Sequence, residues 1–251
     1  MVGIGVVISS LEILARPEAT NDVSWNSWRV LRLRRSWSAA GWTGRAFSLA
    51  LDHPQYLVVI AVRTVAAAVL ALTGPDGALG ALLLWVVTLS LALRGLRTPY
   101  GGEGSDQVFL LVCGALALAA TFGGQRMALW FIAAQVALSY FTSGFAKILH
   151  GDWRNGTALL GVMRTRTWGN EGAARWLDSH TTACRWLSRA MISAEAGFPL
   201  VLLAPSWMLP VLIGAGLGFH LIIAIVMGLN CFVWAFASTY PAVIYVVLTR
   251  P

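Results

Sequence analysis

Residues 127–149 read MALWFIAAQVALSYFTSGFAKIL, and this stretch decides the class of fold. It is apolar along nearly its whole length. It is also long enough to cross a bilayer as a helix, which takes about 20 residues. A membrane-spanning β-strand would be about half as long and would alternate apolar with polar residues. The stretch shows no such alternation, so we predict a transmembrane helix.

Six further apolar blocks follow the same pattern, at 54–73, 78–93, 107–122, 186–204, 207–229 and 232–249. Those at 78–93 and 107–122 are short, so the sequence predicts six or seven spans. Hydrophobic residues make up 57% of the chain and charged residues only 12%, against about a quarter in an average globular protein. The predicted fold is therefore an all-α integral membrane protein, a bundle of six to seven transmembrane helices.

Arginines mark one side of the predicted bundle. They gather before the first span (16, 29, 32, 34, 35 and 45), after the second (94 and 97) and after the fourth (154, 164, 166, 175 and 185). Because basic residues concentrate on the cytoplasmic side, we predict a multi-pass protein of the cell membrane with a cytoplasmic N-terminus. The formal net charge of +7 then reflects topology and contact with anionic lipid, and implies no nucleic-acid partner.

The first 53 residues differ in character from the rest. Residues 2–14 are apolar but short for a span and interrupted by Glu12. The first basic residue, Arg16, follows this run, whereas in a signal peptide it would precede it. Tryptophans at 25, 28, 37 and 42 interleave with arginines, a mixture typical of helices in the headgroup layer. We predict an interfacial amphipathic region over 1–53 and a transmembrane domain over 54–251.

Lys147 is the single lysine in a chain with 17 arginines, and it lies near the end of the quoted stretch. A lysine amine can lose its proton in a desolvated site, whereas an arginine guanidinium cannot. Gln135, Ser139 and Ser143 precede it at every fourth residue, which predicts a polar stripe on one helix face, and Gly144 permits close helix contact there. Two interpretations stay open: a buried proton-accepting amine, or a lysine that reaches from a helix end to the membrane surface.

Other polar side chains lie within or beside predicted spans, where such groups are costly. Glu195 is the only carboxylate well inside a span, and either Lys147 or the mid-span Arg63 is its expected partner. His220 and Asn230 belong to the block 207–229 and the turn after it. A lone histidine in a helix is more often a structural residue than a base. The three cysteines lack metal-ligand spacing, so we expect no metal site.

Around Lys147 the chain reads YFTSGFAKILHGDWRNGTAL over 140–159, which resembles the signature of the vitamin K-dependent γ-carboxylase superfamily. The matching elements are an aromatic–small–glycine group before the lysine, then Trp153, then Gly-Thr-Ala at 156–158. EAGFP at 195–199 and the runs over 219–232 and 240–241 are similar to later helices of the family, and Arg63 and segment 101–107 match in position. The resemblance covers nearly the whole chain and points to a short bacterial member consisting of the family's membrane (HTTM) domain.

The resemblance implies a lysine base inside the membrane. In the carboxylases, a lysine amine deprotonates vitamin K hydroquinone, and the anion reacts with oxygen to give a strong base. That base removes a γ-proton from glutamate before carbon dioxide adds. A buried amine acting on a lipophilic quinol also agrees with the residue-level interpretation. We predict a reduced quinone as cofactor and no metal. The predicted catalytic residues are Lys147, Glu195 and His220, and the predicted substrate-binding residues are Arg63, Ser143, Trp153 and Asn230.

The sequence leaves two functions open. The first is a quinol-dependent enzyme of the carboxylase or epoxidase type. Full carboxylases continue into a large lumenal domain that binds the substrate propeptide, whereas this sequence stops at Pro251, so peptide carboxylation does not follow from the resemblance. The second is a non-enzymatic factor for maturation, export or immunity of a secreted peptide toxin, like the B component of the sporulation-delaying system. It would act with a peptide and partner membrane proteins. A transporter is disfavoured, because we find no inverted repeat or matching broken helices.

Overall fold

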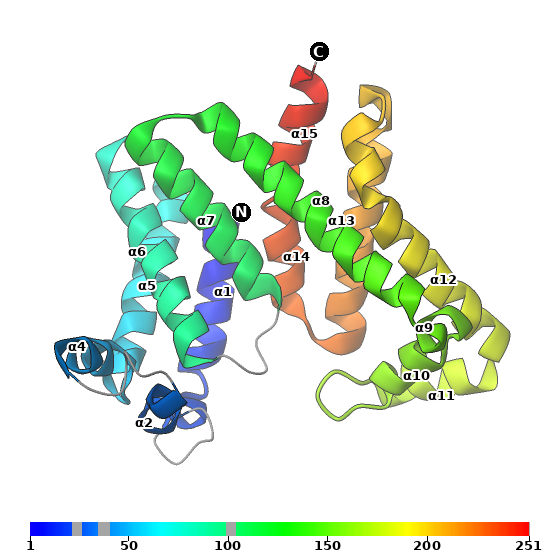
Figure 1. Ribbon diagram of the computed structural model, residues 1–251, viewed down its shortest axis with the longest axis horizontal. Coiled ribbons are helices and arrows are strands. Elements are labelled where there is room, and N and C mark those ends of the chain that lie inside the picture. The colour runs from blue at the N-terminus through cyan, green and yellow to red at the C-terminus, as the bar shows by residue number, and fades with distance from the viewer. Residues whose placement is uncertain (22–26, 35–40, 99–103, 251) are drawn as a thin grey trace. The chain divides into compact units, whose positions relative to one another are not determined.

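The computed structural model describes residues 1–21, 27–34, 41–98 and 104–250, and within these ranges it consists of helices and turns without a β-strand (Figure 1). The chain divides into two compact units, Met1–Ala128 and Leu129–Pro251, which are described separately below. Six helical segments of the described chain are long and apolar enough to cross a membrane. The prediction of an all-α, multi-pass membrane protein is confirmed.

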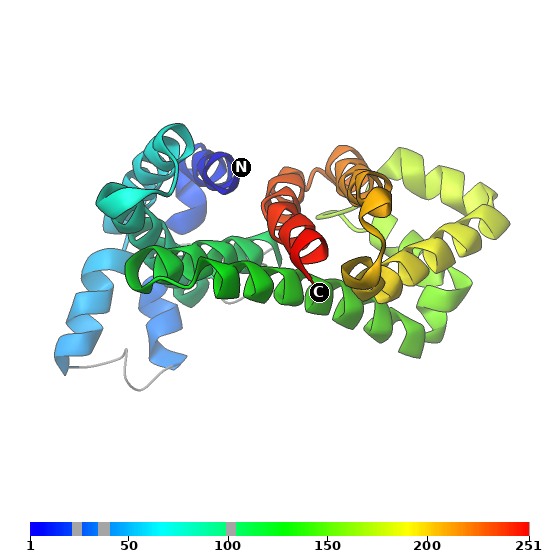
Figure 2. The same cartoon turned by 90° about the horizontal axis from the view of Figure 1, so that it is seen from above.

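These six segments correspond to six of the seven apolar blocks. They are α5 (Gln55–Thr73), α6 (Gly77–Arg97), α7 (Gly104–Phe122), α8 (Gln125–Leu149), the segment Ser206–Met227 with α13 (Leu209–Met227), and Asn230–Thr249. Both views show α8, the longest described helix, running unbroken (Figures 1 and 2). The last segment bends between α14 (Asn230–Ala237) and α15 (Tyr240–Thr249). Pro241 lies at this bend, and its ring cannot donate a helical hydrogen bond.

The seventh block, 186–204, is helical but is not a seventh long apolar segment. Its helix, α12 (Thr181–Gly197), begins before the block and carries Arg185, Arg189 and Glu195. Pro199 lacks the N–H that would continue the α-helix, and the chain goes on as a short 3-10 helix, η3 (Phe198–Leu203). α12 is therefore shorter and more polar than the six spanning candidates.

In the first unit, α1 (Val2–Leu14) packs along α5 and also contacts α7. Gly3 permits the close approach, since a Cβ atom there would lie 2.7 Å from the backbone oxygen of Ala67. Val6 and Ser10, one turn apart on α1, are both fully buried. One face of this short apolar helix therefore rests on the spanning helices.

Two arginines of the spanning helices form hydrogen bonds with α1. Arg63 is fully buried, and its Nε donates a hydrogen bond to Ser10 Oγ at 2.9 Å. Arg94 donates to Ser9 Oγ at 2.6 Å and forms an ion pair of 2.8 Å with Asp106. Arg63 thus points into the interior of the unit. Arg94, which the sequence assigns to a loop, lies in the last turn of α6 and helps to hold the unit together.

The other described N-terminal helices are η1 (Pro17–Thr20), α2 (Trp28–Leu31), η2 (Arg32–Arg34) and α4 (Gly41–Leu51). Trp28 is buried in a cluster with Leu51 and residues of α5, whereas Trp42 is 81% exposed. Trp25, Trp37 and Arg35 of the predicted interfacial region lie outside the described residues, as do residues 101–103 of the matched segment. The placement of residues 1–53 in the headgroup layer stays a prediction.

Arg97, the last residue of α6, holds this N-terminal segment from the other side. It is 1% exposed and donates hydrogen bonds to the backbone oxygens of Leu51 and Thr20. Its guanidinium also lies 4.6 Å from the ring centroid of Tyr56. A residue that the sequence assigns to a basic loop is thus part of the packed interior.

The second unit passes from α8 through three short helices, α9 (Gly151–Asn155), α10 (Thr157–Met163) and α11 (Glu171–Ser179), into α12 and then α13 to α15 (Figure 1). Gly156 joins α9 to α10 with a φ of +92°, a conformation that favours glycine. A Cβ atom at this position would lie 3.0 Å from the backbone nitrogen of Arg185. The glycine of the matched Gly-Thr-Ala group therefore permits a tight turn packed against α12.

Candidate functional site

The site lies where the last turns of α8 cross α12. Ser143, Gly144 and Lys147 occupy one face of α8, because residues three and four apart lie next to each other on a helix. A Cβ atom at Gly144 would overlap the backbone nitrogen of Ala196 and lie 2.8 Å from its Cα. The missing side chain therefore lets the two backbones touch, and this contact places Glu195 beside Lys147.

Lys147 and Glu195 form the closest ion pair of the site. Lys147 Nζ donates hydrogen bonds to Glu195 Oε2 at 2.5 Å and to Ser143 Oγ at 2.7 Å. Ser143 Oγ in turn donates to the same carboxylate oxygen at 3.2 Å. The side chains of Lys147 and Glu195 are only 15% and 9% exposed. Of the two partners that the sequence allows for Glu195, the structure pairs it with Lys147.

Trp153 covers the ammonium group from α9. Its ring centroid lies 5.2 Å from Lys147 Nζ, within the range of a cation–π contact. Ser188 of α12 donates a hydrogen bond to the backbone oxygen of Trp153 and so ties α9 to α12. Ser143, Lys147, Trp153 and Glu195, which the sequence predicts as site residues, are thus brought together.

The close contact at Gly144 leads to a stability prediction. Gly144→Ala is expected to destabilise the protein by about 1–3 kcal/mol, since the added methyl group must push α8 away from α12. Gly214→Ala is the matched control, because Gly214 lies in α13 with no atom within 4 Å of an added Cβ. The midpoint of thermal unfolding in detergent measures the stability of both variants. Equal unfolding midpoints would contradict the close packing of α8 on α12.

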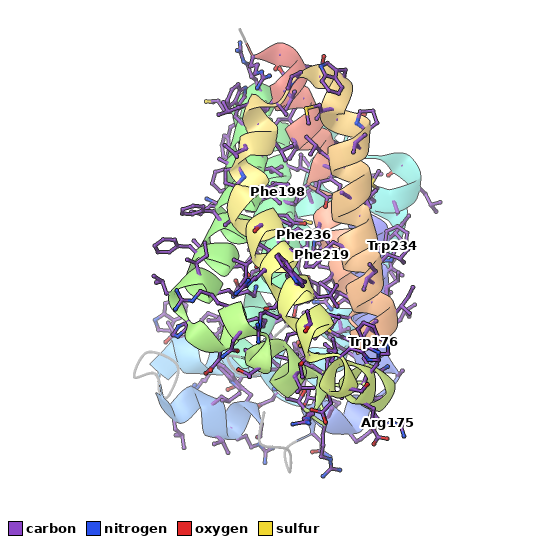
Figure 3. All side chains as sticks on the ribbon, turned by 90° about the vertical axis from the view of Figure 1, so that its right-hand side faces the viewer. Arg175, Trp176, Phe198, Phe219, Trp234 and Phe236 are labelled. Carbon is purple, nitrogen blue, oxygen red and sulfur yellow. The ribbon has the colours of Figure 1, made fainter. Side chains whose placement is uncertain are left out.

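His220 belongs to a neighbouring cluster of buried polar side chains. It lies on α13 at 2% exposure, and its Nε2 is 2.5 Å from the hydroxyl oxygen of Tyr140 on α8. The Tyr140 hydroxyl is also 3.2 Å from that of Tyr240 on α15. Aromatic rings stack on two of these side chains, with 4.0 Å between the ring centroids of Phe198 and Tyr140 and 4.1 Å between those of Phe236 and His220. Phe198 and Phe236 are labelled in Figure 3.

A mostly apolar cavity of about 310 Å³ lies between α8, α12, η3 and α13. Glu195 and Tyr140 both line it, so it touches both the ion pair and the tyrosine–histidine cluster. The rest of its wall is largely apolar and includes Phe198, Val201 and Phe219. An apolar cavity with a few polar groups on its wall is typical of a small-molecule site.

Two predicted site residues have other surroundings in the structure. Arg63 belongs to the first unit, where it contacts Ser10. Asn230 begins α14 and is exposed. Tyr140 and Tyr240 belong to the matched segments 140–159 and 240–241, but the sequence interpretation does not name them as site residues. Tyr140 precedes Ser143 by three residues and Lys147 by seven, a helical spacing that could have identified it.

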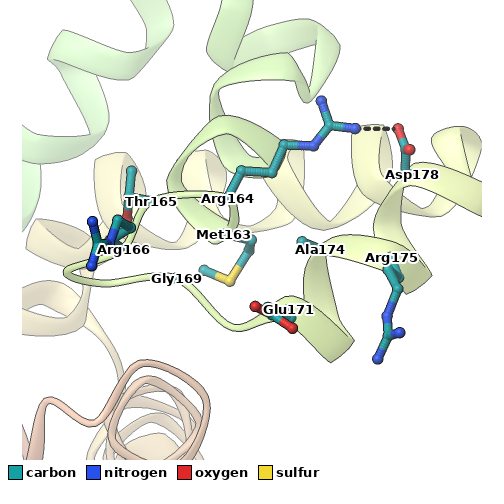
Figure 4. Close-up of a pocket in the computed structure, with 9 residues that line it drawn as sticks. All are labelled: Met163, Arg164, Thr165, Arg166, Gly169, Glu171, Ala174, Arg175 and Asp178. Carbon is teal, nitrogen blue, oxygen red and sulfur yellow. Dashed lines mark ion pairs between the residues drawn. The ribbon is translucent and has the colours of Figure 1, made fainter.

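A second, more polar pocket of about 580 Å³ lies around α10 and α11 (Figure 4). It is lined by three arginines and two carboxylates, among them Arg164 and Asp178, which form an ion pair of 2.9 Å. Both partners are 56% exposed, and exposed pairs of this kind contribute little. None of the predicted site residues lines this pocket.

No family model, curated protein or solved structure matches this chain. Among the residues that the structure describes, no three His, Cys, Asp or Glu side chains gather closely enough to hold a metal ion. The chemistry proposed below therefore rests on the ion pair, the cavity beside it and the sequence resemblance.

Proposed function

We propose that this chain is a membrane enzyme with chemistry similar to that of the vitamin K-dependent γ-carboxylases. In this proposal, the Lys147–Glu195 pair removes a proton from a lipophilic, quinol-type substrate. The observation that carries the proposal is the 2.5 Å contact between Lys147 Nζ and Glu195 Oε2, with Glu195 on the wall of an apolar cavity. Ionisable side chains inside a membrane domain are costly and usually mark a functional site.

The proton balance of the pair supports this role. At rest the pair is an ammonium beside a carboxylate, with no net charge. A proton can pass from Nζ to Oε2, and the neutral amine can then take the proton of a substrate hydroxyl. Alternatively, the carboxylate takes that proton directly. Either route ends with an ammonium, a neutral Glu195 and a substrate anion.

In this proposal, the Lys147 ammonium stabilises the substrate anion in apolar surroundings. An opposite charge in a site of low dielectric constant stabilises a new anion far more than it would in water. Ser143 and Trp153 hold the ammonium in position. The cavity fits an uncharged aromatic ring, since its wall is mostly apolar with polar groups at Glu195 and Tyr140.

The proposal extends to the setting of the enzyme. We place it among the short HTTM-domain proteins of bacteria, in the cell membrane, with the N-terminus and residues 151–185 in the cytoplasm, where their arginines meet anionic lipid. A reduced quinone is its proposed cofactor. A peptide and partner membrane proteins are its proposed further contacts.

The test is oxygen-dependent epoxide formation from vitamin K hydroquinone by the purified protein. We expect the wild type to form epoxide and Lys147→Ala to form none above background, because the variant lacks the counter-ion of the substrate anion on either route and also lacks the amine base. A folded wild type that forms no epoxide would contradict the proposal. That outcome would favour the non-enzymatic factor for peptide-toxin maturation.

A further inference from the structure

Besides the exposed Ser193, two polar side chains line the apolar cavity, and the proposed function uses only one of them. Glu195 on α12 is the first, and Tyr140 on α8 is the second. Glu195 is hydrogen-bonded to Lys147, whereas Tyr140 lies within hydrogen-bonding distance of His220 and Tyr240. The cavity therefore offers two sets of hydrogen-bonding groups to one ligand.

The hydrogen bonds around Tyr140 can run in one consistent direction. If Tyr140 donates its hydroxyl proton to Nε2 of His220, the neutral imidazole carries its own proton on Nδ1. Nδ1 is buried and has no hydrogen-bond partner among the described residues. Tyr240 then donates to the Tyr140 oxygen at 3.2 Å. In this arrangement the Tyr140 hydroxyl donates to His220 and accepts from Tyr240.

In this arrangement the Tyr140 oxygen has one accepting position that no described residue occupies. A phenolic oxygen can donate one hydrogen bond and accept two, and Tyr240 occupies one of the accepting positions. Stacking on Phe198 at an interplanar angle of 18° fixes the ring at the cavity wall. A ligand hydroxyl in the cavity would therefore find a fixed acceptor in Tyr140.

We infer that Tyr140, held by His220 and Tyr240, recognises a second hydroxyl group of the ligand, so that the cavity selects an aromatic diol over a simple phenol. This inference rests on the proposed function, in which Glu195 and Lys147 take the proton of the first hydroxyl. Tyr140 is a specificity-determining residue in this scheme. His220 and Tyr240 position it.

Gly216 on α13 provides an independent way to disturb Tyr140. A Cβ atom at Gly216 would overlap the Tyr240 hydroxyl and lie 3.2 Å from the Tyr240 Cζ atom. Gly216→Ala should therefore displace Tyr240 and remove its support from Tyr140. Gly218, on the same helix, has no atom within 4 Å of an added Cβ, so Gly218→Ala is the matched control.

The experiment compares equilibrium binding of 1,4-dihydroxynaphthalene, kept reduced without oxygen, with that of 1-naphthol, which lacks the second hydroxyl and adds no bulk. We expect wild type and Gly218→Ala to bind the diol about tenfold more tightly than the phenol, the value of one good hydrogen bond. In Tyr140→Phe and Gly216→Ala this ratio should fall toward one. Glu195→Gln should weaken both ligands and keep the ratio.

The outcomes separate the two proposals. A wild-type ratio near one, or a ratio unchanged in both Tyr140→Phe and Gly216→Ala, would overturn the role of Tyr140. The proposed function would survive that result if Glu195→Gln still weakened binding. No binding of either compound to folded wild type would overturn both. Thermal unfolding of each variant shows whether it is folded. If Tyr140→Phe does not fold, Gly216→Ala alone tests the role of Tyr140.

Discussion

Lys147→Arg is expected to lower epoxide formation from vitamin K hydroquinone by at least about 100-fold while the protein stays folded, since a general base contributes roughly that much or more. Arginine keeps a positive charge beside Glu195 and can pair with a carboxylate through two hydrogen bonds. It cannot give up its proton and accept another. The variant therefore keeps the counter-ion and removes the base.

The contrast between the two possible proton routes makes this substitution informative. If the Glu195 carboxylate takes the substrate proton directly, an arginine at 147 still stabilises the anion, and activity survives. Retained activity would thus eliminate Lys147 as the base and assign that role to Glu195. Arg189→Lys is the matched control, a change of one exposed cation for another on α12. Its rate should equal that of the wild type.

The spanning helices could be predicted from the sequence because their signal is local. A block of about 20 apolar residues identifies a span without knowledge of its neighbours. The block 186–204 is the exception. Its helix begins earlier, at Thr181, and includes Arg185 and Arg189, and its α-helical part ends before Pro199. An apolar window alone does not show where a helix starts. The prediction of six or seven spans rested on the short blocks 78–93 and 107–122, and both of these belong to the six spanning segments.

The ion pair could be predicted only as one of two alternatives. Lys147 and Glu195 were identified because charged groups are rare in apolar blocks, but sequence distance does not say which charges meet. The pairing of Glu195 with Lys147 depends on Gly144, whose missing side chain lets α12 pack against α8 at Ala196. A close contact between backbones depends on both helices, and a small residue on one of them indicates only that contact is permitted.

The tyrosine–histidine cluster could not be predicted from the sequence, and only His220 was named in advance as a site residue. Tyr140, His220 and Tyr240 come from three helices, and each is an ordinary residue in an aromatic-rich membrane chain. The burial of α1 was missed for the same reason. Its contacts with Arg63 and Arg94 lie far away along the chain. Arg94, which the sequence analysis used as a marker of topology, thus also connects α6 to α1.

Replacing either partner of the Lys147–Glu195 pair is expected to destabilise the fold more than replacing both. Lys147→Met leaves a carboxylate without its ammonium, and Glu195→Gln leaves an ammonium without its carboxylate. Breaking a buried pair in this way costs about 3–5 kcal/mol, whereas a double replacement leaves no unpaired charge. Unfolding of the wild type, both single variants and the double variant in detergent gives the coupling energy between the two sites.

The exposed pair Arg164–Asp178 provides the control for this cycle. Its distance of 2.9 Å is close to that of the buried pair, but both of its side chains are 56% exposed, against 15% and 9% for Lys147 and Glu195. Water screens the exposed charges, so the cycle of Arg164→Met and Asp178→Asn should give a coupling of about 1 kcal/mol or less. Losses at Lys147 and Glu195 that add to within about 0.5 kcal/mol would mean that the two residues stabilise the fold independently. The ion pair would then no longer support a shared proton, and the proposed base would have to act without Glu195.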